Sequence, residues 1–213
     1  MSWKPPSHIE KTHLLLVEGR DEEMFFDALI RNLKLDNNIQ IIQGGKTSFR
    51  DRLQLLKEGM SGFEDVVSIG IVRDADDSAE SAFQSICDAL DALELPTPDD
   101  LLSATPESPH ISILIMPPGN EGTNRMLEDL CLASAQGDLA LDCVEQYFDC
   151  LGEQGITLDD NKIAKARVHA FLASRPEPDK RLGEAAQASY WNWNSPVFGI
   201  VKNFLKQIAT IAD

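Results

Sequence analysis

Three acidic side chains stand where two apolar stretches of the sequence end. Glu18 directly follows the apolar run 13–17, and Asp74 and Asp76 follow the β-branched run 66–72. An Asp-x-Asp pair in extended chain directs both carboxylates to the same side, because successive side chains alternate. Carboxylate oxygens are the ligands that Mg²⁺ and Mn²⁺ take in proteins. These residues therefore predict a divalent-cation site, in which the ion relieves the repulsion between the paired acids.

A second short motif indicates phosphate binding. The sequence Gly-Gly-Lys-Thr-Ser at 44–48 matches the end of a nucleotide-binding P-loop. The complete motif requires glycine at a position where this chain has Gln40, so we exclude an ATP-hydrolysing P-loop. Lys46, together with neighbouring backbone N–H groups, remains a predicted contact for one substrate phosphate.

The elements that position these residues alternate between strands and helices. Continuous apolar runs predict strands at 13–17, 39–42, 66–72 and 111–116. Apolar residues at helical spacing predict helices at 21–33, 48–57, 78–93, 123–133, 138–150, 159–173, 181–189 and 196–211, with Ser78 capping the third. Right-handed crossovers between such strands give a parallel sheet, so we expect Glu18 and Asp74 at the same edge of it.

The predicted fold is therefore α/β, with a mainly parallel, Rossmann-like sheet flanked by helices and a helical C-terminal extension. The segment 95–109 is rich in Pro, Ser, Thr and Asp and predicts a surface loop. We expect no strand after residue 135. This divides the chain into an α/β core at 1–135 and a helical extension at 136–213 that packs on it.

Composition limits the class of protein. The 213 residues are 43% hydrophobic, which suffices for a sizeable core. The apolar stretches are too short to cross a bilayer and the first residues lack the apolar region of a secretory signal, so we expect a cytoplasmic protein without a membrane partner. With 35 acidic and 19 basic residues, the net charge of −16 argues against extended nonspecific binding to duplex nucleic acid. We expect four buried free thiols, at Cys87, Cys131, Cys143 and Cys150.

The order of the acidic motifs resembles the Toprim domain of topoisomerases, bacterial primases, recombination-mediator proteins and the overcoming-lysogenization-defect nucleases. That domain carries a Glu after its first strand and an Asp-x-Asp after its third, matched here by Glu18 and by the pair at 74–76. The chain is most similar to small stand-alone Toprim-like proteins of unknown role. Their Pro-Gly-rich turn before Leu-Glu, their Lys-Ala helix and their Trp- and Phe-bearing tail are matched at 117–128, 165–166 and 193–198, so the resemblance covers nearly the whole chain.

This resemblance implies roles for the acids. Asp74 and Asp76 would bind Mg²⁺ or Mn²⁺, and Glu18 would bind metal or act as the general base for an attacking water. Toprim domains often carry Asp four residues after this Glu; here that place holds Glu22, a carboxylate of longer reach. Glu22 is then a further metal ligand or a residue that favours the positive N-terminus of a helix. Glu128 is likewise a further metal ligand or part of a solvated helix face.

Two more features each allow two interpretations. Lys165 matches the lysine of Toprim nucleases, which implies a catalytic contact to phosphate; the alternative is an ordinary surface lysine. Trp191 and Trp193 would form a stacking platform for bases or, as we expect, pack into the core.

The function that this pattern implies is Mg²⁺-dependent phosphodiester hydrolysis or phosphotransfer on nucleic acid. No gyrase, primase or helicase module accompanies the domain, so their activities do not carry over. The alternative is a non-catalytic Toprim-like module that binds a nucleotide, a nucleic-acid end or a protein partner. Cations gathered around the acids would favour a phosphate substrate, and the candidates are Lys46, Arg50, Arg73, Arg125 and Lys165.

Overall fold

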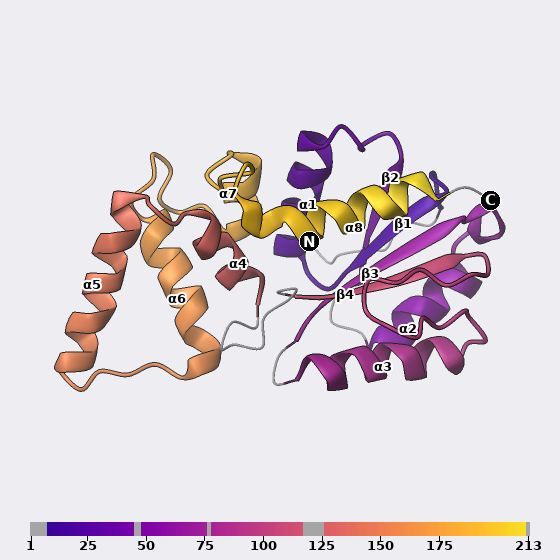
Figure 1. Cartoon of the computed structure of the whole chain (residues 1–213), viewed down its shortest axis with the longest axis horizontal. Helices are drawn as coiled ribbons and strands as arrows, with labels where there is room; N and C mark the ends of the chain where they lie inside the picture. The colour runs from indigo at the N-terminus through magenta and orange to yellow at the C-terminus, as the bar shows by residue number, and fades with distance from the viewer. Residues whose placement is uncertain (1–7, 45–47, 76–77, 117–125, 212–213) are drawn as a thin grey trace.

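A parallel four-stranded sheet forms the centre of the molecule (Figure 1). The computed structural model describes residues 8–44, 48–75, 78–116 and 126–211. The strands lie in the order β2-β1-β3-β4 and every pairing is parallel. They are β1 (His13–Val17), β2 (Ile39–Gln43), β3 (Ser68–Asp74) and β4 (His110–Met116). The predicted α/β class, with a helical C-terminal part, is confirmed.

Helices connect and follow the strands close to the predicted positions. They are α1 (Arg20–Asn32), α2 (Phe49–Gln54), α3 (Ala79–Asp91), α4 (Leu127–Ser134), α5 (Leu139–Glu153), α6 (Asp160–Leu172), α7 (Leu182–Gln187) and α8 (Gly199–Thr210). The helix predicted at 48–57 changes form, because α2 continues as a π-helical turn (Leu55–Gly59). Short 3-10 turns (Phe63–Asp65 and Pro196–Phe198) precede β3 and α8. Ser78 caps α3 as expected, its hydroxyl accepting from the backbone N–H of Ser81.

Both faces of the sheet are covered, because alternate residues of each strand point to opposite sides. Leu15 and Val17 belong to one core cluster with residues of α1, α4, α7 and α8. Leu14 and Leu16 belong to a second cluster with residues of α2 and α3. Figure 1 shows α1 and α8 on one side of the sheet and α3 on the other. This two-sided burial explains why the strands read as continuous apolar runs.

The third strand lies two residues later than predicted, at Ser68–Asp74 instead of 66–72. Its first residue, Ser68, lies opposite His13, the first residue of β1. Its last residue, Asp74, lies opposite Met116 of β4. Asp74 is therefore the last residue of the strand and does not follow it.

The predicted loop 95–109 covers the outer edge of β4. The backbone N–H groups of Leu102 and Thr105 donate to the carbonyls of Ile113 and Ile111. The unpaired backbone groups of an exposed strand edge can pair with another chain. These two bonds occupy two carbonyls on the outer edge of β4.

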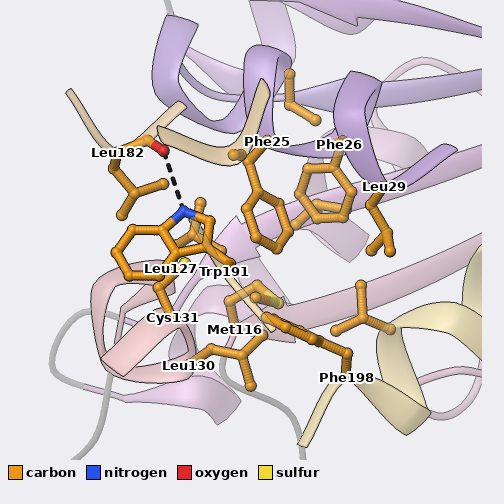
Figure 2. Close-up of a cluster of buried hydrophobic side chains, with 14 of the residues drawn as sticks. Phe25, Phe26, Leu29, Met116, Leu127, Leu130, Cys131, Leu182, Trp191 and Phe198 are labelled. Carbon is orange, nitrogen blue, oxygen red and sulfur yellow. Dashed lines mark hydrogen bonds between the residues drawn. The ribbon is translucent and has the colours of Figure 1, made fainter. Parts of the chain in front are cut away.

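The C-terminal segment returns to the sheet. α7 packs against α1, and α8 packs across β3. Trp191 is only 2% exposed, and its indole N–H donates to the carbonyl of Leu182 (Figure 2). Trp193 packs against Phe25, with ring centroids 5.3 Å apart. The expectation that these tryptophans pack into the core is confirmed.

The helices α5 and α6 pair with each other beyond the end of the sheet (Figure 1). Among the described residues, one face of α5 is exposed: Leu139 is 80% and Tyr147 is 54% exposed. Cys143 and Cys150 are also exposed, so the prediction of four buried thiols is wrong for these two. Across the described ranges, each helix is too short or too polar to span a membrane.

Candidate functional site

The carboxyl ends of β1 and β3 form the centre of the candidate site. Glu18 directly follows β1, and Asp74 ends β3, its neighbour in the sheet. The helices that follow these two strands, α1 and α3, cover opposite faces. Where the helices that follow two neighbouring strands leave to opposite faces, a crevice opens at the strand ends. This crevice is the usual ligand site of an open parallel sheet.

One cluster of charges lies on the side of α2. The Arg73 Nε atom is 3.7 Å from Glu18 Oε1, an ion pair too long for a hydrogen bond. The guanidinium carbons of Arg52 and Arg73 lie 5.3 and 6.0 Å from the centre of the Phe49 ring. Two cations therefore share a single aromatic ring, and one of them also pairs with Glu18.

Arg52 reaches this cluster by passing over the end of β2. A Cβ atom added to Gly44 would lie 2.1 Å from Arg52 Cδ, so only glycine leaves room for the arginine side chain. Burial lowers the pKa of Arg52, and the carboxylates of Glu18 and Glu22 act in the opposite direction. The Arg52 charge therefore lies within the field of both acids.

A second cluster joins α1, α4 and α6. Glu22 is in the first turn of α1 and folds back toward Gly19, where an added Cβ would be 2.6 Å from Glu22 Oε2. Glu128 is in the first turn of α4, and its side chain is 17% exposed. Lys165 Nζ on α6 lies 4.0 Å from Glu128 Oε1.

The surroundings of Glu128 disfavour its ionised form. Burial raises the pKa of Glu128, while a backbone hydrogen bond and Lys165 lower it. Glu22 raises this pKa further, which means that the two carboxylates feel each other.

The structure thus brings together most of the predicted acids that it describes. Glu18 pairs with Arg73 and Glu128 pairs with Lys165, while Glu22 acts electrostatically on Glu128. Asp74 is at the same edge, although alternation along β3 directs Arg73 and Asp74 to opposite faces. The predicted residues Asp76, Lys46 and Arg125 lie outside the described residues, and Arg50 is exposed on α2.

A metal centre is not complete in the described part of the chain. Within residues 8–44, 48–75, 78–116 and 126–211, no three His, Cys, Asp or Glu side chains are grouped so that they could hold an ion. The carboxylates at this edge are the donor type that Mg²⁺ takes. A three-ligand site would therefore need a ligand outside the described residues, and Asp76 is the predicted one.

Sequence reasoning missed Arg52 and Phe49. The available signal was their position: both follow the glycine pair that closes the second strand, three residues apart in a predicted helix. Residues three apart lie on one helix face, so Phe49 and Arg52 had to point the same way.

The comparisons with known proteins identify a family and nothing more specific. A protein family described as "Protein of unknown function (DUF3226)" matches residues 12–210. No curated protein and no solved structure matches the chain.

Proposed function

The chain belongs to the DUF3226 family of proteins of unknown function, and because that membership assigns no activity, we propose from the site that it hydrolyses phosphodiester bonds in nucleic acid with the help of Mg²⁺. The observation that carries this proposal is the mixture of charges at one edge of the sheet. Arg52, Arg73 and Lys165 are cations suited to a phosphate, and they stand among carboxylates suited to a metal or to proton transfer.

The chain's own residues divide into two roles. Arg52, Arg73 and Lys165 would bind phosphate groups of the substrate. The present partners of Arg73 and Lys165 are carboxylates at 3.7 and 4.0 Å, which an anionic substrate can replace. Glu18 would accept a proton from the attacking water or bind the metal, the two roles that a carboxylate at this position can serve.

Asp74, Asp76 and Glu18 would hold the ion, with Glu22 and Glu128 as further candidates. When bound, Mg²⁺ or Mn²⁺ supplies charge stabilisation to the attacking and leaving oxygens. Glu18 would then give up its ion pair with Arg73, which leaves the arginine available to the phosphate.

The test is a panel of single- and double-stranded DNA and RNA, incubated with Mg²⁺ or Mn²⁺ at low salt. Low salt matters because a chain of net charge −16 has few cations with which to replace phosphate counterions. We expect cleavage by the native chain and a loss of several orders of magnitude in Glu18→Gln and in Asp76→Asn, which keep side-chain size and remove charge.

The matched control is Glu64→Gln, the same substitution at an exposed carboxylate on the 3-10 turn before β3, at the opposite end of that strand. It should cleave at the native rate. Equal cleavage by the Glu18 and Asp76 variants would mean that the activity belongs to another site or a contaminant.

A second candidate is a non-catalytic module that binds a nucleotide, a nucleic-acid end or a protein partner. The pairing of Glu18 with Arg73 favours it, because an acid already neutralised by a cation needs no metal. Binding that depends on Arg73, without cleavage under any metal, would select this candidate.

A further inference from the structure

An apolar pocket of about 390 Å³ lies directly beside the charged cluster. Its walls come from the carboxyl ends of β1 and β2 and from the helical segment 49–60. The apolar side chains that line it include Leu16, Ile42, Phe49, Leu55 and Met60. Its volume falls within the range of pockets that bind small molecules, roughly 300–1,000 Å³.

Two arginines lie at the pocket, beside the carboxylates of Asp51 and Glu18. Arg52 is itself part of the lining, and Phe49, another lining residue, has both Arg52 and Arg73 near its ring. Arg73 Nε is buried and makes no hydrogen bond to any residue that the structure describes. A ligand that fits this arrangement is apolar at one end and anionic at the other.

The lining also offers specific polar contacts. Gln43 and Asp51 are the polar residues of the wall besides Arg52. Alternation along β2 directs the Gln43 side chain away from the face of Ile42, so Asp51, exposed on α2, is the group that can accept from an N–H on the edge of a heterocyclic base. A fatty-acid chain offers this carboxylate no donor, which favours a base over an aliphatic anion.

We infer that this pocket receives the base of a nucleotide whose phosphate is held by Arg52 and Arg73. This inference rests on the proposed function, since it names the part of the substrate that the site recognises. A free nucleotide and the terminal nucleotide of a strand share this chemistry. Base contacts with aromatic and apolar side chains supply affinity that the phosphate alone does not have.

The test compares four probes by calorimetry, with and without Mg²⁺: adenosine 5′-monophosphate, ribose 5-phosphate, octanoate and a short 5′-phosphorylated oligonucleotide. We expect the nucleotide or the oligonucleotide to bind at least about tenfold more tightly than ribose 5-phosphate, because stacking of one base contributes that much. Binding of free adenosine monophosphate identifies a mononucleotide ligand, and binding of the oligonucleotide alone identifies a strand end.

Two variants separate the base from the phosphate. Leu55 is 41% exposed, so Leu55→Asn changes the pocket wall with little risk to the fold. It should remove the preference over ribose 5-phosphate and leave the affinity for ribose 5-phosphate unchanged. Arg73→Gln should weaken both ligands by the same factor. The control is Leu139→Asn, the same change at an exposed leucine on α5, which should alter neither affinity.

The outcomes distinguish this inference from the proposed hydrolysis. Cleavage of nucleic acid without any preference for the base, or with a preference that Leu55→Asn leaves intact, overturns the base pocket alone. Octanoate binding as tightly as the nucleotide also overturns it. The chain could also show a base preference that Leu55→Asn abolishes and yet cleave no nucleic acid. That result supports the base pocket and overturns the proposed hydrolysis.

Discussion

The surroundings of Glu128 in the folded chain disfavour the ionised form of its carboxyl group. Burial is the main cause of its raised pKa, and Lys165, at 4.0 Å, only partly offsets it. In the unfolded chain the group ionises around its ordinary value of 4.5. Above that pH the folded state binds protons more readily than the unfolded state, so ionisation of Glu128 reduces stability.

Glu128→Gln should therefore be more stable than the native chain at neutral pH in the absence of divalent cations. The advantage should shrink as the pH falls below the ordinary value, because Glu128 is then protonated in both states. Urea denaturation across that pH range measures it. The exposed control Glu64→Gln should stay within about 0.5 kcal/mol of the native chain throughout. A native chain that is the more stable one at neutral pH would contradict the argument.

Gly44 is the residue that allows Arg52 to reach the site. In Gly44→Ala the new Cβ would meet the Arg52 side chain at 2.1 Å, and this flexible side chain must move away. We expect a change in unfolding free energy within about 1 kcal/mol. The loss of one charge-assisted contact should weaken ribose 5-phosphate binding by about tenfold.

Gly199→Ala is the control for this experiment, because an added Cβ there meets nothing within 4 Å. It should leave ribose 5-phosphate binding unchanged. Native affinity in Gly44→Ala would mean that Arg52 does not contact the phosphate.

At the scale of elements, the contact between α1 and α7 depends on a glycine. A Cβ on Gly183 would lie 2.7 Å from the backbone carbonyl oxygen of Asp21 and 2.7 Å from Met24 Cβ. The Gly183 N–H also donates to the Asp21 carboxylate at 3.1 Å. The two helices can approach this closely only because residue 183 has no side chain.

Gly183→Ala should therefore destabilise the fold by about 1–3 kcal/mol, the usual cost of overpacking, because backbone atoms cannot swing aside. Gly152→Ala is the matched control on α5, where nothing lies within 4 Å of an added Cβ. It should stabilise by up to about 1 kcal/mol through helix propensity alone. Thermal unfolding measures both, and equal effects would show that α7 is not tightly packed on α1.

Much of the arrangement of elements was predictable from local pattern. The strand 13–17 was placed at its observed residues because it is a continuous apolar run. The ends of β3 were not predicted correctly. They depend on pairing with β1 and β4, whose residues are distant in sequence. The exposure of Cys143 was missed for a similar reason, since helical spacing does not show whether a face has a neighbour.

The candidate site was predictable to the same degree. Glu18 was correctly expected at the carboxyl end of a strand, because it directly follows the apolar run 13–17, and that strand, β1, is central in the sheet. Its pairing with Arg73 depends on which face of β3 each side chain takes. The approach of Arg52 over Gly44 depends on how α2 lies against the sheet, and sequence pattern gives no angle for that.

At the scale of the whole molecule, the first and last parts of the chain share one core. Ile208 on α8 is fully buried, and an added Cβ on Gly70 of β3 would lie 2.1 Å from its Cδ1 atom. Below it, the buried Ser68 hydroxyl donates to the Ile208 carbonyl at 3.0 Å. The helix α8 is therefore in direct contact with a central strand.

Ile208→Ala should lower the unfolding free energy by about 2–5 kcal/mol, the cost of a cavity in a buried core. Ile200→Ala on the same helix, where the side chain is 39% exposed, should cost much less. Tryptophan fluorescence and circular dichroism should report one coincident transition in each variant. Separate transitions would mean that the sheet and the C-terminal helices unfold independently.

The position of α8 also bears on how the chain acquires its fold during synthesis. All four strands leave the ribosome before the residues of α8 are made, at roughly 5–20 residues per second. For those seconds the face of β3 that carries Gly70 lacks its cover and presents apolar surface to the surroundings. We therefore expect the nascent sheet to be open to chaperone binding until α8 packs on it.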